Sequence, residues 1–337
     1  MLAFSDLVRD SRLKTRFSSK YTQHVYYVSG ETPRQRKVRR EERWERRESL
    51  GSGSFGTVWL EKLTAEHARY RAVKEIRKIQ RGSNTISYGR ELEAIAKFSH
   101  EKYELCFVKS YGWYENDASV FIAMEYFPNG DLQSYLSSPL PEKEVQQITF
   151  QILEALSFMH ENGFAHRDLK PSVRLPWLFL NILVKSKSPD WWVKVGDFGI
   201  SKRAEDGLTA LRTFSGTPGF LAPELLVQNG LLDSNELKFG NEYTTAVDIW
   251  ALGEIVFRAL TGQAPFARSL GAYIRGTSPF PVEMMLSNDI SGEGCDFVKS
   301  LMAPLPKDRP TAPIAEEHTW MESLRPSSPR SSVEFER

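Results

Sequence analysis

Three glycines in the first quarter of the sequence are spaced so that backbone amides between them could contact phosphate oxygens. They are Gly51, Gly53 and Gly56 in "LGSGSFGTVWLEK". A dinucleotide-binding turn would require a helix to begin at the third glycine, whereas the β-branched and aromatic residues of "TVWLEK" predict a strand. We therefore expect a β-hairpin whose tip can fold over phosphates, because residues without Cβ let N–H groups approach the oxygens. Taken alone, the motif is equally compatible with a plain hairpin turn.

A lysine in the next predicted strand offers a positive charge for such phosphates. Lys74 follows Ala72 and Val73 in "RAVKEI". A lysine in an apolar strand is usually solvated at the sheet edge, so its use at an anion requires a carboxylate that holds the ammonium group. Glu91, in the predicted helix "SYGRELEAIAKFSH", is the candidate for that carboxylate.

Three further motifs follow in order, "HRDLKP" from His166, "KVGDFGISK" from Lys194 and "GTPGFLAPE" from Gly216. Together with the glycine-rich hairpin and the lysine–glutamate pair, they match the signature set of eukaryotic protein kinases. The chain resembles that family over residues 43–320. The lysine of "HRDLKP" and Thr217 make it similar to serine/threonine kinases, and "DGLTALRTFSGTPGFLAPE" resembles most the calcium/calmodulin-dependent and checkpoint-like group.

The resemblance implies an enzyme that transfers the γ-phosphoryl group of ATP to serine or threonine hydroxyls of protein substrates. Asp168 would accept the proton of the substrate hydroxyl, and Lys170 would lie near the γ-phosphate. Lys74 would pair with the α- and β-phosphates and be held by Glu91. Residues implied around ATP are Leu50, Gly51, Gly53, Gly56, Val58, Ala72, Lys74, Met124, Glu125, Phe127 and Asp131.

The resemblance also implies a metal site and two structural contacts. Asp197 and Asn181 would bind Mg²⁺, a hard cation that prefers oxygen ligands. Asp248 would hold the backbone of the "HRD" turn. Glu224 and Arg309 resemble the buried ion pair that anchors the helical lobe.

Eight extra residues interrupt the loop that should join the catalytic aspartate to the metal-binding asparagine. The family places four residues between the two, but residues 169–180 separate Asp168 from Asn181 here. Deleting "VRLPWLFL", residues 173–180, restores "HRDLKPSNILV", which identifies Asn181 as the family's asparagine.

Three interpretations of the insert are open. It is a tolerated loop that turns at Pro176, a translated fragment of non-coding sequence, or a change that has retired the enzyme and left a catalytically impaired kinase-like scaffold. An exposed "WLFL" weighs against a solvated loop, because such apolar patches invite aggregation. The chain keeps all four residues that the chemistry needs, namely Lys74, Glu91, Asp168 and Asp197. Their presence favours descent from active enzymes.

The pattern of elements predicts an α+β fold, the two-lobed protein kinase fold. Residues 43–124 contain short β-rich runs and one helical segment, and form a small N-lobe. Helices dominate the larger C-lobe, residues 128–320. Within it, "PEKEVQQITFQILEALSFMHENG" has apolar residues on one helix face, and "TAVDIWALGEIVFRALTG" is apolar almost all round, as in a buried helix. We expect a disordered or irregular segment over 1–42 and a disordered tail over 321–337.

Composition bounds the partners. The 337 residues are 41% hydrophobic and 26% charged, and the net charge of +1 gives no general case for nucleic acid or membrane as partner. Cys106 and Cys295 are interpreted as reduced thiols, and the chain begins without a secretory signal. We therefore expect a cytoplasmic or nuclear protein, while the oligomeric state is not specified.

The charged run "RQRKVRREERWERR" is interpreted as a solvated lead-in, with a basic address signal or nucleic-acid contact as the alternative.

One threonine is placed for regulation by phosphorylation. Thr213 lies four residues before Thr217, the spacing at which related kinases carry an activating phosphate. A phosphate adds about −1.5 to −2 charges and could pair with Arg167. Ser215 and Thr209 are alternative sites.

Overall fold

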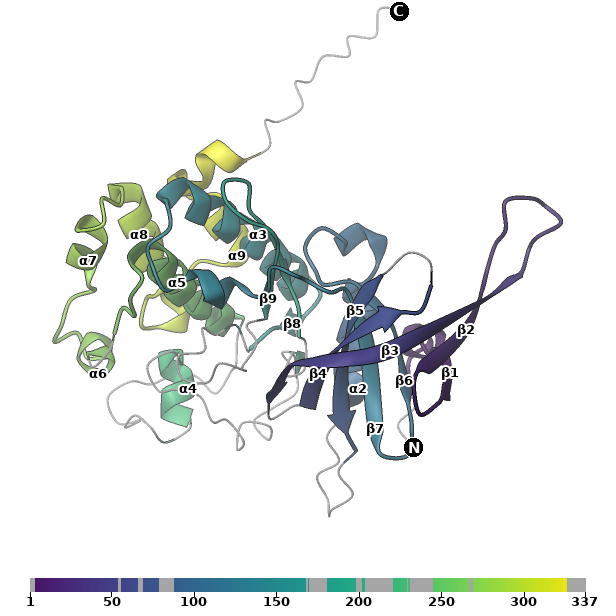
Figure 1. Ribbon diagram of the computed structural model, residues 1–337. Helices are drawn as coiled ribbons and strands as arrows, with labels where there is room; N and C mark the ends of the chain where they lie inside the picture. Colours follow the sequence, from purple (N-terminus) through teal and green to yellow (C-terminus); the bar gives the residue numbers. More distant parts are fainter. Residues whose placement is uncertain are drawn as a thin grey trace, which may run out of the picture.

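A strand-rich lobe from the N-terminal part of the chain meets a helical lobe from the C-terminal part (Figure 1). The computed structural model describes residues 4–53, 56–65, 69–78, 88–167, 169, 181–197, 202–203, 221–228, 230, 245–266 and 269–325. This arrangement is the α+β division that the sequence predicts. None of the helices in these ranges has the length and hydropathy that crossing a bilayer requires.

One antiparallel sheet forms the N-lobe. Its strands are β1 (Lys14–Phe17), β2 (Thr22–Val28), β3 (Val38–Gly53), β4 (Gly56–Leu63), β5 (Tyr70–Arg77), β6 (Ser110–Glu115) and β7 (Ser119–Met124). Their order is β1-β2-β3-β4-β5-β7-β6, and every neighbouring pair is antiparallel. The strands β2 and β3 extend away from the lobe as a long hairpin (Figure 1). Two α-helices accompany the sheet, α1 (Asp6–Asp10) and α2 (Tyr88–Phe98), followed by the 3₁₀ helix η1 (Glu101–Tyr103).

The N-terminal segment is ordered over much of its length, so the expectation of a disordered or irregular segment over residues 1–42 is wrong there. Strands β1, β2 and the start of β3 extend the sheet. The N–H of Leu13 donates to the carbonyl of Trp113 at 2.8 Å, and the N–H of Trp113 donates to the carbonyl of Ser11 at 3.1 Å. The first and last strands of the sheet therefore approach each other. The segment orders because it fills these backbone positions and adds Phe17, whose ring lies 5.8 Å from that of Tyr114.

A buried polar network ties the N-terminal strands to the centre of the sheet. Arg71 on β5 pairs with Glu61 on β4 at 2.6 Å, and both are almost completely buried. Arg71 also lies 2.8 Å from Nε2 of His24 on β2. Burial and the charge of Arg71 lower the pKa of His24 to about 3. The imidazole is therefore neutral, so Nε2 accepts from Arg71 and Nδ1 donates to Thr15 Oγ1 at 2.9 Å.

Helices pack around a single core in the C-lobe. They are α3 (Glu142–Glu161), α4 (Pro223–Gln228), α5 (Ala246–Thr261), α6 (Leu270–Ile274), α7 (Val282–Leu286), α8 (Gly292–Leu301) and α9 (Ala312–Glu316), with 3₁₀ helices η2 (Leu132–Tyr135), η4 (Pro306–Asp308) and η5 (Thr319–Leu324). Short strands complete the lobe, β8 (Phe164–Ala165), β9 (Ile182–Ser186), β10 (Trp192–Val195) and β11 (Lys202–Arg203). The strands pair as β9–β10 and β8–β11.

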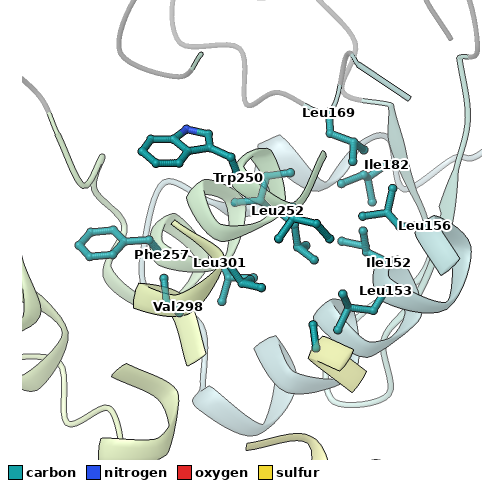
Figure 2. Packing of buried hydrophobic residues seen from close by; sticks show 14 of the residues in the cluster. Ile152, Leu153, Leu156, Leu169, Ile182, Trp250, Leu252, Phe257, Val298 and Leu301 are labelled. Atoms are coloured by element: carbon teal, nitrogen blue, oxygen red, sulfur yellow. The ribbon is translucent and has the colours of Figure 1, made fainter. Parts of the chain in front are cut away.

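Both helices predicted for this lobe are confirmed. Apolar side chains of α3, such as Ile152 and Leu156, face Leu252 of α5, and α8 adds Leu301 to the same cluster (Figure 2). The helix α3 ends before Gly163, whose φ is 75°, and α5 ends at Gly262 in the left-handed conformation. Both endings follow the usual preference for glycine there. The predicted C-terminal tail begins within η5, which includes residues 321–324. Residues 326–337 lie outside the described part.

Candidate active site

A cavity of about 370 Å³ opens between the two lobes. Eight of the residues predicted around a nucleotide line it, namely Leu50, Val58, Ala72, Lys74, Met124, Glu125, Phe127 and Asp131. Gly51, Gly53 and Gly56 are outside its lining, in the hairpin formed by β3 and β4. The remaining wall includes side chains that the sequence did not single out, among them Val108 and Leu183. Leu183 had a local signal, because it lies two residues after Asn181 in an apolar strand.

The glycine-rich hairpin is formed as predicted. Gly51 is paired with Val58 and Gly53 with Gly56, where β3 turns into β4. Gly56 has a φ of 128°, and a Cβ at this position would lie 1.9 Å from the carbonyl oxygen of Glu75. Any other residue would therefore push β4 away from β5, the strand that carries Lys74.

Three side chains from separate segments meet at the inner wall of the cavity. Nζ of Lys74 on β5 lies 2.6 Å from Oε1 of Glu91 on α2 and 2.6 Å from Oδ1 of Asp197. Burial alone would lower the pKa of Lys74, but the charges of Asp197 and Glu91 outweigh it and raise that pKa, so the ammonium stays charged. Burial raises the pKa of Glu91, and the charge of Lys74 opposes that shift. The predicted contact between Lys74 and Glu91 is confirmed.

The backbone around Asp197 brings it next to Asn181. Gly196 donates its N–H to the carbonyl of Asn181 at 2.8 Å, and its own carbonyl lies 3.0 Å from Nε2 of His166. A Cβ on Gly196 would lie 2.7 Å from the side chain of Val108, so the packing of this segment against Val108 requires glycine. Asp197 itself has a φ of 56°, a left-handed conformation. The two residues predicted to bind metal are therefore neighbours across two chain segments.

Asp248 holds the turn before the predicted catalytic aspartate. Its carboxylate, buried at the start of α5, accepts from the N–H of His166 at 2.8 Å and from the N–H of Arg167 at 2.7 Å. His160 on α3 lies 3.0 Å from the same carboxylate. Burial alone would raise the pKa of Asp248, but His160 and the N–H of Arg167 lower it. The predicted role of Asp248 at this turn is confirmed.

Several predicted residues lie outside the described part of the chain. They are Asp168 and Lys170, the insert 173–180, and the threonines and serine of the predicted regulatory segment, Thr209, Thr213, Ser215 and Thr217. The described residues nearest to the insert on either side are buried, since Leu169 is 4% exposed and Asn181 is 2% exposed.

The predicted anchor of the C-lobe is formed. Arg309 makes two bonds to the carboxylate of Glu224, at 2.7 and 2.8 Å. It also donates to the carbonyls of Ala303, Ala246 and Pro304, so a single guanidinium joins α4 to the start of α5 and to the residues before η4.

The link between the lobes runs through Glu125. Its N–H donates to the carbonyl of Lys109 at 2.9 Å. Its carboxylate pairs with Lys194 on β10 at 3.0 Å and with Lys185 on β9. These ion pairs join the segment after β7 to the C-lobe, and both Glu125 and Phe127 line the cavity.

The comparisons with known proteins agree with this geometry. Residues 44–321 match the protein kinase domain family. The chain is 32% identical over 302 residues to serine/threonine-protein kinase cds1 of Schizosaccharomyces pombe. The match covers 86% of this chain and 61% of cds1. It is 32% identical over 296 residues to serine/threonine-protein kinase RAD53 of Saccharomyces cerevisiae, covering 86% of this chain and 34% of RAD53. The chain thus spans less than two thirds of either relative.

A second group of relatives and two crystal structures are also similar. Calcium/calmodulin-dependent protein kinase type 1 of Caenorhabditis elegans is 30% identical over 287 residues, covering 83% of this chain and 74% of that protein. The structure of the Rad53 kinase domain and SCD2 has a TM-score of 0.60 at 27% identity, covering 87% of this chain and 91% of that one. The same domains in complex with AMPPNP give a TM-score of 0.55 at 28% identity, covering 82% and 90%.

Proposed function

The chain belongs to the protein kinase domain family, and on that basis we propose that it transfers the γ-phosphoryl group of ATP to serine or threonine hydroxyls of protein substrates. The observation that carries the proposal is the junction of Lys74, Glu91 and Asp197 on the wall of the interlobe cavity. A charged, buried ammonium group is suited to bind phosphate oxygens, and Glu91 keeps it in place from the other side.

Asp197 and Asn181 are proposed to hold Mg²⁺. They offer carboxylate and amide oxygens, which suit a hard divalent cation, and the bond between Gly196 and Asn181 keeps them adjacent. A bound Mg²⁺ would neutralise charge on the phosphates. Lys74 would then share Asp197 with the metal, while Glu91 continues to fix the ammonium group.

Asp168 is proposed to accept the proton of the substrate hydroxyl, with Lys170 close to the γ-phosphate. Support comes from the anchored residues on either side. The N–H of Arg167 is held by Asp248, and Leu169 is buried in the C-lobe core. Anchored neighbours would orient a base between them, and such positioning is the main contribution a protein makes to phosphoryl transfer.

The insert is the reason for considering a second candidate function, a catalytically impaired kinase-like scaffold. Eight extra residues, 173–180, stand between the proposed base and Asn181. Because Leu169 and Asn181 are both buried, we favour a loop that leaves the catalytic groups in place.

The test compares the full chain with a form lacking residues 173–180, using labelled ATP, Mg²⁺ and basic peptides that contain serine or threonine. Transfer by both forms supports the kinase with a tolerated loop. Transfer by the shortened form alone assigns the loss to the insert and supports the scaffold for the full chain. Inactivity of both would refute the proposed activity. Asp197→Asn should lower any transfer by at least about a hundredfold, since it removes the metal-binding charge.

We also propose the cytoplasm or nucleus as its location. Cys106 and Cys295 are free thiols, a state typical of reducing compartments. Fractionation of cells that produce the tagged protein would test this.

A further inference from the structure

Helix α1 packs against α2, the helix that carries Glu91. Val8 is the buried residue of α1, with 1% of its surface exposed. It belongs to an apolar cluster with Leu92 of α2, Ile76 of β5 and Trp113 of β6. Leu92 is adjacent to Glu91 in sequence, so the two residues occupy neighbouring positions on the same turn of α2.

Trp113 holds the N-terminal segment in this position. Its indole N–H donates to the carbonyl of Val8 at 2.7 Å, and its backbone bonds to Ser11 and Leu13. The ring of Phe4 meets the indole edge-on, with centroids 5.4 Å apart. The guanidinium of Arg12 lies 5.2 Å from the same ring. Residues 4–13 are therefore attached to β6 by backbone bonds as well as by side chains.

A glycine makes this attachment possible. Gly112 has a φ of 115°, and a Cβ there would lie 2.5 Å from the carbonyl of Ser11 and 2.9 Å from the side chain of Leu13. The chain at Gly112 is thus shaped to receive residues 11–13. This contact is separate from the cavity, since Gly112 and the N-terminal residues are not among its lining.

We propose that residues 4–13 hold α2 in the position where Glu91 meets Lys74, and that Val8 is the positioning residue of this contact. The inference rests on the proposed kinase function, because it assigns the contact a purpose in nucleotide binding. Helix α2 has 11 residues, too few to be stable alone in water. Its place therefore depends on the surfaces it touches, and α1 covers the Leu92 side while Lys74 meets the Glu91 side. A buried carboxylate that lost its partner would be costly, so displacement of α2 weakens the site as a whole.

The experiment uses the full chain with Val8→Asp and the matched control Leu7→Asp. Leu7 stands next to Val8 on α1, but 59% of its surface is exposed. Two quantities are measured, hydrogen exchange of the α2 amides and the affinity for ATP with Mg²⁺. We expect Val8→Asp to speed α2 exchange and weaken the affinity by about tenfold or more, which corresponds to roughly 1.4 kcal/mol. Leu7→Asp should match the unaltered chain, and exchange in α3 and α5 should be unchanged in both variants.

A purely structural role for the segment would give a different result. If Val8→Asp speeds exchange in residues 4–17 but leaves α2 exchange and ATP affinity unchanged, the inference is wrong. If Val8→Asp unfolds the N-lobe, Gly112→Ala decides by the same two measurements, because it disturbs the attachment without placing a charge in the core. Both readouts are independent of phosphoryl transfer. A chain that shows the expected exchange and affinity pattern but transfers no phosphate would support the positioning and refute the proposed activity.

Discussion

Lys74 and Glu91 come within 2.6 Å of each other although one belongs to a strand and the other to a helix 17 residues further along the chain. Asp197, 123 residues from the lysine, reaches the same ammonium group from the other lobe. The contact therefore depends on the position of α2 and on the approach of the two lobes. A single substitution at Lys74 tests both.

Lys74→Met should lower both phosphoryl transfer and ATP affinity. The substitution removes the positive charge that both carboxylates contact, so the pKa of Glu91 should rise further. We expect transfer to fall by at least about a hundredfold, as when a preorganised electrostatic group is removed. Steady-state assays and nucleotide titration measure the two effects. Lys78→Met, which alters a lysine paired with Glu115 outside the cavity, is the control. Unchanged affinity in Lys74→Met would contradict the assignment.

Asp248→Ala should destabilise the C-lobe. It leaves the N–H groups of His166 and Arg167 and the imidazole of His160 without their acceptor. Each buried group left unsatisfied costs about 1–3 kcal/mol, so the free energy of unfolding should fall by about 3 kcal/mol or more. Urea titration measures it, with the exposed Asp190→Ala as the control. Equal stability of the two variants would show that these bonds contribute little.

Arg309→Ala should have a large effect as well, because it leaves Glu224 charged and buried. Loss of one partner of such a pair typically costs about 3–5 kcal/mol. Adding Glu224→Ala should recover part of the loss, since the uncompensated carboxylate is then gone. The measurement is a double-mutant cycle by denaturant unfolding, and strictly additive effects would argue against the pair.

His24 should make stability fall in mild acid. Its folded pKa of about 3 is lower than its ordinary value of 6.5, so between these values the unfolded chain binds a proton that the folded chain does not. The stability that neutral His24 contributes to the fold is complete above pH 6.5 and is lost as the pH falls toward 3. From pH 7.5 to pH 5 the loss from this residue is about 2 kcal/mol. The free energy of unfolding is measured at both pH values for the native chain and for His24→Gln. The native chain should lose about 2 kcal/mol more than the variant. An equal loss in both would show that the imidazole becomes protonated in the folded chain.

The site could be predicted where a motif fixes residue types at set spacings. Lys74 with Glu91, the turn held by Asp248, and Glu224 with Arg309 were all predicted and are present. In each case the chemistry limits the residue that can stand there. The run "TVWLEK", predicted to be a strand, likewise lies within β4.

The N-terminal strands could not be predicted, because their stability comes from distant residues. The segment "KTRF" of β1 has no apolar alternation of its own. Its order comes from residues about a hundred positions away in sequence, because Phe17 packs against Tyr114 and the N–H of Leu13 donates to the carbonyl of Trp113. The wall of the cavity was partly missed for the same reason. Val108 lines it, and its N–H donates to the carbonyl of Val195, which is distant in sequence.

The attachment of residues 11–17 to the last strands of the sheet has a consequence for how the protein would be produced. The family match begins at residue 44, inside β3. A recombinant chain cut at that point would lose residues 11–13, whose backbone bonds to Trp113 cover the outer edge of β6. It would also uncover the rings of Tyr114 and Phe121 beneath Phe17. Unpaired strand edges beside apolar surface are templates for aggregation. The boundary suggested by sequence similarity is therefore a poor place to start an expression clone, and one that begins at the first residue keeps that edge covered.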